Sequence, residues 1–361
     1  MEDKEIITFK EGEIRLTQFS RSSGCGCKIA PKVLEEILQN NLSFPNTNNR
    51  LLVGNSSADD AAVYDLQNGM VLISTTDFFT PVVDDAYDFG RIASANAISD
   101  IYAMGGTPIM AIAILGWPVD KIPTAVAQKV IEGSRAICEK AGISLAGGHS
   151  IDSIEPIFGL AVTGMTELPN LKRNNTANNG DHIFLTKPVG VGILSTAQKR
   201  GVLKVEHSEE LIKQLIVLNK AGIALGKIEG VSAMTDVTGF GLAGHLIEMT
   251  EGNNLSAEIH YSRIKIAPNA KEYLSQRMIP DATYRNWNSF SSKISFEKGV
   301  NVMEAFSILP DPQTNGGLLF ACHPKSIVEV QQVLKNEGLE IYTEPIGQFV
   351  ERKEKLISVL N

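Results

Sequence analysis

Short apolar runs alternate with helical patterns along most of this chain of 361 residues. Runs rich in valine, isoleucine and leucine predict strands at 51–53, 61–64, 70–74, 108–115, 143–146 and 158–165, the one at 108–115 buried. Between them, 89–104 and 121–141 have helical spacing, and Asp88 is placed to cap the first of these helices. That helix is almost entirely small or apolar, so we expect it to be largely buried.

The alternation resumes after a polar segment, 168–180, whose asparagines and proline predict a linker. In the second half the pattern predicts strands at 181–186 and 318–321, helices at 213–227, 242–250 and 326–336, and a last pair of strands. We therefore expect an α/β or α+β protein. Its predicted parts are a flexible arm with a first helix (31–39) over residues 1–50, then two domains, 51–168 and 181–361.

Composition and charge narrow the classes of function. Apolar residues make up 43% of the chain and charged residues 20%, which suits a globular protein with real cores. The net charge of -8 argues against a nucleic-acid partner, and a polyanionic substrate would need metal ions or a locally basic pocket. The longest apolar run, 108–119, is too short to span a membrane.

The cysteines and the first residues of the chain indicate the cellular compartment in which the protein is expected. The first residues are charged, with no apolar region of a signal peptide behind them. The four cysteines do not form two metal-ligand pairs, and Cys138 and Cys322 stand in apolar surroundings, where we expect them to be buried. We therefore expect a cytoplasmic protein.

Five aspartates stand among small, apolar or Thr/Gly residues rather than in charged runs: Asp59, Asp60, Asp77, Asp100 and Asp236. Asp60 and Asp77 follow predicted strands, whereas Asp100 lies on the buried helix, where a carboxylate is costly unless it is paired or metal-bound. A satisfied structural hydrogen bond is the alternative for Asp100. Mg²⁺ shared with substrate phosphates would remove the repulsion within such a cluster. Because no Gly-x-x-x-x-Gly-Lys phosphate loop is present, the pattern predicts a Mg–ATP site of another kind.

Two further stretches carry candidate chemistry. Residues 24–28 read Gly-Cys-Gly-Cys-Lys, where Arg21 and Lys28 favour the thiolate of Cys25. Lys28 could fold over phosphates on this glycine-rich arm, although an idle terminal tail with two thiols is the alternative. Residues 147–150, Gly-Gly-His-Ser, follow a predicted strand and could turn backbone N–H groups toward phosphate oxygens.

Seven motifs occur in a fixed order: Gly-Cys-Gly-Cys-Lys, Asp-Asp-Ala-Ala-Val-Tyr, Ser-Thr-Thr-Asp-Phe-Phe, Asn-Ala-Ile-Ser-Asp-Ile-Tyr-Ala-Met-Gly-Gly, Ala-Gly-Gly-His-Ser-Ile, Met-Thr-Asp-Val-Thr-Gly-Phe-Gly and Asp-Pro-Gln-Thr-Asn-Gly-Gly. With them the chain resembles the selenophosphate synthetase (selenide, water dikinase) family from about Leu16 to Gly347. The resemblance implies a two-domain fold like that of aminoimidazole ribonucleotide synthetase and a homodimer. It also implies the conversion of ATP, selenide and water to selenophosphate, AMP and phosphate, with selenide supplied free or by a delivery protein.

The resemblance also assigns roles to residues. The family's essential cysteine falls on Cys25, its catalytic lysine on Lys28, and its metal-binding aspartates on Asp60, Asp100 and Asp236. The nucleotide contacts that it implies are Lys28, Ser57, Ala58, Asp59, Asp77, Asp100, Gly148, His149 and Ser150. One departure is visible, because Asn315 stands where we expect serine.

Two alternatives explain less of the chain. A kinase of the same fold, such as thiamine-phosphate kinase, would also bind Mg–ATP through clustered aspartates, but it lacks a Cys-Gly-Cys-Lys arm. A metal- or redox-binding protein would use Cys25 and Cys27, which supply two of the four ligands of a structural zinc site. A disulfide between these two cysteines would close a very small, strained ring. Neither cysteine-based alternative accounts for the aspartates.

Overall fold

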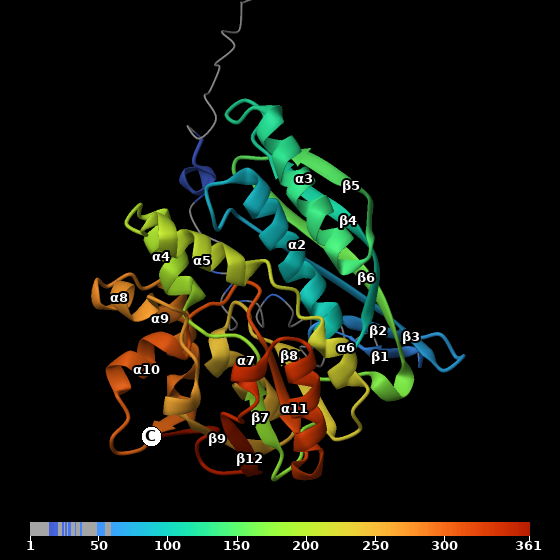
Figure 1. Ribbon diagram of the computed structural model, residues 1–361, viewed down its shortest axis with the longest axis vertical. Helices are drawn as coiled ribbons and strands as arrows, with labels where there is room; N and C mark the ends of the chain where they lie inside the picture. Colours follow the sequence, from blue (N-terminus) through green and yellow to red (C-terminus); the bar gives the residue numbers. More distant parts are fainter. Residues whose placement is uncertain are drawn as a thin grey trace, which may run out of the picture.

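A computed structural model describes residues 14–20, 24, 26, 28, 29, 33, 37, 49–54 and 59–361. Two sheets, built from successive halves of the chain, carry the helices around them (Figure 1). The predicted first helix lies mostly outside the described residues, although Val33 and Ile37 are helical. Four predicted site or arm residues also lie outside them: Cys25, Cys27, Ser57 and Ala58.

The first sheet has the strand order β1-β2-β3-β6-β4-β5 and is antiparallel except between β4 and β5. Its strands are β1 (Leu51–Val53), β2 (Ala62–Asp65), β3 (Met70–Phe79), β4 (Thr107–Trp117), β5 (Ser144–Asp152) and β6 (Ile157–Glu167). The helix α3 (Thr124–Ala141) connects β4 to β5, as a crossover between parallel neighbours requires.

The helices α2 (Ala86–Ala103) and α3 pack on each other beside the first sheet (Figure 1). Glycine makes their contact possible, because a Cβ on Gly90 would lie 1.9 Å from the carbonyl oxygen of Val130. From Phe89 to Ala103, every residue except Arg91 is buried, which confirms the sequence prediction. The helix begins earlier than predicted because Asp85, not Asp88, is the cap and accepts the backbone N–H of Asp88.

The face of the first sheet away from α2 is open. On β4, Pro108, Ala111 and Ala113 are buried, whereas Ile109, Met110 and Ile112 are 45%, 45% and 46% exposed. The strand predicted at 108–115 is present, but the prediction that it is buried is wrong for these exposed positions. On β3, Phe78 is 48% exposed on the same side. We call Phe78, Ile109, Met110 and Ile112 the open apolar face.

The second sheet has the order β10-β13-β9-β12-β7-β11-β8. Its strands are β7 (His182–Leu185), β8 (Val231–Asp236), β9 (Leu255–His260), β10 (Ile294–Phe296), β11 (Leu318–Cys322), β12 (Gly347–Glu351) and β13 (Ile357–Leu360). The last two strands do not pair with each other but lie on either side of β9.

Helices of the second half are α4 (Val191–Lys199), α5 (Val205–Leu215), α6 (Ala221–Gly226), α7 (Gly241–Gly252), α8 (Ala270–Ser275), α9 (Asp281–Phe290), α10 (Val302–Ile308) and α11 (Ile327–Asn336). The helix predicted at 213–227 is wrong, since 216–220 separate α5 from α6. Among the described residues, no helix is long and apolar enough to cross a membrane. Cys138 and Cys322 are buried as predicted, and burial raises the pKa of their thiols to about 11 and about 12.

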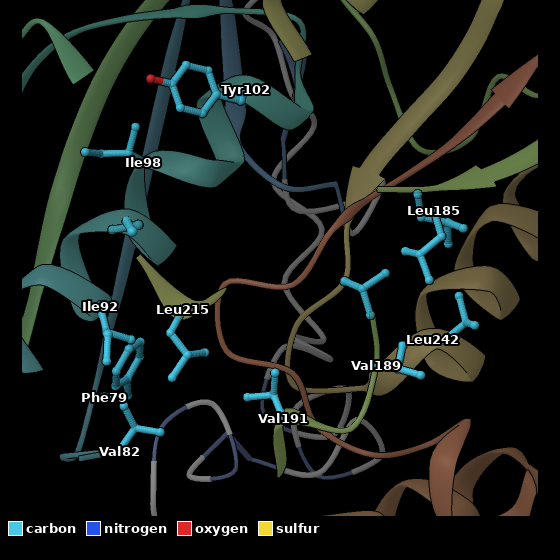
Figure 2. Close-up of a cluster of buried hydrophobic side chains, with 14 of the residues drawn as sticks. Phe79, Val82, Ile92, Ile98, Tyr102, Leu185, Val189, Val191, Leu215 and Leu242 are labelled. Carbon is cyan, nitrogen blue, oxygen red and sulfur yellow. The ribbon is translucent and has the colours of Figure 1, made fainter. Parts of the chain in front are cut away.

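The helix α2 also packs on β8, α5 and α6, so it lies between the two halves (Figure 1). A Cβ on Gly222 of α6 would lie 2.1 Å from the carbonyl oxygen of Tyr102, which shows how closely α6 approaches α2. Figure 2 shows Leu215 of α5 beside Ile92 of α2 and Phe79 of β3, and all three belong to one buried cluster. This shared core fixes α2 relative to the second sheet.

Candidate nucleotide and metal site

Three of the predicted aspartates meet where α2 packs on β8. Asp60 precedes β2, Asp100 lies in the last turn of α2, and Asp236 ends β8. Burial raises the pKa of Asp60 well above its usual value, and the charges of Asp236, Asp59 and Asp100 raise it further. Burial also raises the pKa of Asp100, followed by the charges of Asp236 and Asp77. These carboxylates therefore interact strongly although they come from both halves of the chain.

Neighbouring hydroxyls hold all three carboxylates in place, and the Thr75 hydroxyl donates to Asp100. The Thr235 hydroxyl donates to Asp60 Oδ1 at 2.7 Å, and the Ser99 hydroxyl donates to Asp236. The second carboxylate oxygens, Asp60 Oδ2 and Asp236 Oδ2, are enclosed without a hydrogen-bond partner among the described residues. An enclosed carboxylate oxygen without a donor is costly, and a bound cation would satisfy it.

Asp59 borders the cluster and is held by the main chain. One oxygen accepts the backbone N–H groups of Asp60 and Asn174, each at 3.2 Å. Although these bonds lower the pKa of Asp59, burial outweighs them and raises it to about 6. The bond from Asn174 also joins the segment after β6 to the site.

Asp77 lies inside β3 rather than at a strand end, so that part of the sequence prediction is wrong. Its carboxylate accepts a hydrogen bond from the Asn96 side chain and lies 3.9 Å from the Lys28 amine, measured from Oδ2 to Nζ. The charge of Lys28 also lowers the pKa of Asp100 and Asp236. The structure thus brings Lys28 of the arm to the aspartates.

The structure does not bring the segment 148–150 to the aspartates within one chain. Gly148, His149 and Ser150 lie within the continuous strand β5, so the predicted end of this strand at residue 146 is wrong. They are exposed, at the edge of the first sheet, with β6 and β4 between β5 and the strand that carries Asp77. Within one chain, Gly148 therefore lies three strand spacings from Asp77.

The cluster is incomplete as a metal centre. Across the described ranges, no three His, Cys, Asp or Glu side chains are grouped closely enough to hold a metal ion by themselves. Three carboxylate oxygens of the cluster, Oδ2 of Asp59, Asp60 and Asp236, are enclosed without a hydrogen-bond partner among the described residues, and they nevertheless fit a divalent cation. Mg²⁺ is usually bound by one or two carboxylates together with waters and substrate phosphates, so an incomplete set suits Mg–ATP better than a permanent metal.

Several residues that position the site were not predicted from the sequence. Asn315 donates its backbone N–H to Asn96 Oδ1 at 2.7 Å, and Asn219 donates to the Ser99 hydroxyl at 2.7 Å. Asn96 shares a helix face with Asp100, four positions away, and that spacing was the available signal, whereas Ser99 directly before Asp100 offers none. No local pattern indicates the partners from the second half.

The comparisons with known proteins agree with this architecture. Residues 58–166 match the family model described as AIR synthase related protein, N-terminal domain, and residues 178–359 match the corresponding C-terminal domain. Among solved structures, the thiamine monophosphate kinase of Aquifex aeolicus is similar with a TM-score of 0.63 and 16% identity, covering 91% of this chain and 94% of that one. The fold is thus that of the AIR synthase-related proteins, as the resemblance implied.

Within this class, the curated relatives are far closer in sequence. The selenide, water dikinase of Haemophilus influenzae (strain 86-028NP) is 52% identical over 350 residues, covering 97% of this chain and 99% of the relative. That of Pseudomonas putida (strain KT2440) is 52% identical over 347 residues, covering 96% and 99%. This chain belongs to the selenide, water dikinase family.

Proposed function

We propose that this chain converts ATP, selenide and water to selenophosphate, AMP and phosphate. The observation that carries the proposal is the meeting of Asp60, Asp100 and Asp236 with Lys28 at one place. Membership of the selenide, water dikinase family supports selenide as the phosphoryl acceptor. A phosphoryl transfer needs mainly positioned charge. The aspartates supply negative charge that can hold Mg²⁺, and Lys28 supplies positive charge.

We assign the metal ligands to Asp60, Asp100 and Asp236. Mg²⁺ bound there would neutralise the phosphate oxygens of ATP. Asp59 and Asp77, with Ser57 and Ala58 outside the described residues, would contact the nucleotide. The partly buried Asp77 keeps Lys28 within reach of the phosphates, where the amine can offset charge that develops during transfer.

Cys25 lies outside the described residues, and we assign it a role beside the selenium atom because the family's essential cysteine falls on this position. The backbone N–H of Gly24 donates to the Thr80 carbonyl at 3.1 Å, next to the strand that carries Asp77. Selenide is already largely anionic near neutral pH, so its attack needs no strong base. Water then cleaves the ADP-level intermediate to AMP and phosphate.

We further propose a cytoplasmic homodimer that pairs two copies of the open apolar face. The four exposed side chains of this face lie on one sheet, on β3 and β4 with β6 between them, and exposed apolar patches are typical of interfaces. A face-to-face pairing would also offer a route for residues 148–150 of one copy to meet the aspartates of the other. The dimer would then supply the nucleotide contacts that a single chain lacks.

Phosphorus NMR tests the reaction directly. With ATP, Mg²⁺ and selenide, we expect signals of selenophosphate, AMP and phosphate in equal amounts. Cys25→Ser should bind ATP yet form no selenophosphate, whereas the matched variant Cys27→Ser should keep activity. Absence of both selenophosphate and AMP in the wild type would refute the assignment, and a fully active Cys25→Ser would remove Cys25 from the chemistry.

A further inference from the structure

A cavity of about 380 Å³ opens beside the arm at Gly26. One wall is a single face of α4, because its lining residues recur at helical spacing: Gly192, Ser195, Thr196 and Lys199. The other walls are the start of α9 and the segment before β11, with the lining residues Ile279, Pro280, Asp281, Ala282, Arg285, Pro312 and Thr314, and Arg200 adjoins Lys199.

The cavity is basic although the chain is acidic. Three cationic side chains, Lys199, Arg200 and Arg285, face one carboxylate, Asp281. The whole chain has a net charge of -8, so this concentration of positive charge runs against the average. Clefts lined by one sign of charge attract the opposite charge, which makes an anion the natural occupant.

The cations also hold the arm. Arg285 donates to the Gly26 carbonyl at 2.9 Å, and Lys199 donates to the Ser20 carbonyl at 2.6 Å. A guanidinium carries five N–H donors in a planar fork that suits oxyanions. Arg285 uses one of these donors in its contact with Gly26, so it can bind the arm and an anion together.

Two neutral features add donors at the same place. Ser195 is 4% exposed, and its hydroxyl has no hydrogen-bond partner among the described residues. The ten-residue helix α9 begins after Pro280, and no side chain caps its first N–H groups. An uncapped helix N-terminus favours anions, and the unpartnered hydroxyl supplies a donor.

We propose that this cavity binds a phosphoryl oxyanion, namely the phosphate or the selenophosphate that leaves the aspartate site. The choice of these ligands rests on the proposed function. Two walls lead directly to that site: Gly26 is two residues from Lys28, and Thr314 precedes Asn315, which bonds Asn96. A phosphoryl group that has left the nucleotide and its Mg²⁺ is attracted by the three cationic side chains of the cavity.

Calorimetric titration of the full chain tests this site without turnover. Orthophosphate is one probe, and thiophosphate, as a stable analogue of selenophosphate, is the other, both without Mg²⁺ or nucleotide at fixed ionic strength. We expect Arg200→Gln and Arg285→Gln each to weaken binding by about tenfold, the loss of one charge-assisted hydrogen bond. Arg352→Gln is the matched control, because Arg352 is also exposed and donates to a backbone carbonyl at 3.3 Å, as Arg200 does at 3.4 Å.

The outcomes separate this proposal from the reaction. Binding of orthophosphate, of thiophosphate or of both that weakens about tenfold in both cavity variants supports the site, and the probe that binds shows whether phosphate or selenophosphate is its ligand. No binding by the wild type, or equal binding by both cavity variants, overturns the site even if selenophosphate is formed. If phosphate binding depends on Arg200 and Arg285 but the protein forms no selenophosphate, the anion site is supported and the proposed reaction is refuted.

Discussion

Asn96 of the first half is joined to Asn315 of the second half by a hydrogen bond, in which the backbone N–H of Asn315 donates to Asn96 Oδ1 at 2.7 Å. The amide nitrogen of the same Asn96 side chain donates to Asp77, the carboxylate nearest Lys28. Asn96 is fully buried. Its two hydrogen bonds link the second half of the chain to Asp77 in the candidate nucleotide site. Both of its contacts should matter for stability, and one of them for binding.

Asn96→Ala should lower the free energy of unfolding by about 2–3 kcal/mol, because it leaves the Asn315 N–H buried without a partner. It should also weaken ATP binding, since Asp77 loses its donor. Urea unfolding and ATP titration measure the two effects. Ser94→Ala is the control on the same helix: it loses the bond to Ser134 and some stability but should keep ATP affinity. Unchanged stability and ATP affinity in Asn96→Ala would contradict the link.

Asn315 is the one residue at which the chain departs from the expected motif. Its side-chain amide donates to the carbonyls of Leu215 and Val217 at 2.6 and 2.9 Å, and its φ is 47°. Asn315→Ser should therefore cost about 2 kcal/mol in unfolding free energy, because serine makes neither bond. Asn315→Gly loses the same bonds but tolerates this φ, so it should be the less destabilised variant. A serine variant as stable as the wild type would show that the amide contacts contribute nothing.

Lys187 should make stability depend on pH. Its amine is buried and donates to the carbonyls of Val217 and Asn315, and burial lowers its pKa to about 7. Between this value and the usual 10.5, only the unfolded chain carries the extra proton, so stability rises with pH. From pH 7 to 9, the wild type should gain about 2 kcal/mol relative to Lys187→Met. Parallel urea-unfolding profiles for the two proteins would contradict this.

The open apolar face should control the oligomeric state. Ile112→Glu places a charge in the centre of this face and should turn a wild-type dimer into a monomer in sedimentation velocity. Val328→Glu is the control, because Val328 is 78% exposed on α11, away from the first sheet. If Ile112→Glu sediments as the wild type does, the pairing of these faces is wrong.

The local sequence pattern predicted most helices and strands, because hydrophobic periodicity and helix capping are properties of neighbouring residues. It failed where tertiary contacts decide the length or the burial of a strand. Asp77 and residues 147–150 were expected beyond strand ends, but pairing with β6 extends β3 and pairing with β4 extends β5 through them. The alternating exposure of β4 was hidden because both of its faces are apolar in sequence.

The sequence predicted the charged residues of the candidate site but not the residues that hold them in place. Unusual surroundings made Asp60, Asp100 and Asp236 visible, since carboxylates are rarely placed among apolar residues without a function. Thr235 and Asn315 carry no such signal, because their roles come from partners more than 170 and 200 positions away in sequence. Such pairings arise only when α2 packs between the two sheets.

The central claim is that aspartates from both halves hold one Mg–ATP complex, and calorimetric titration of ATP with Mg²⁺ tests it most directly. Asp60→Asn and Asp236→Asn should each weaken binding by at least about tenfold, and the double variant by less than the product, because both act on the same ion. Asp65→Asn is the control, since Asp65 bonds only the backbone of Gln67 in the described contacts of its side chain. Wild-type affinity in Asp60→Asn and Asp236→Asn would contradict a shared site.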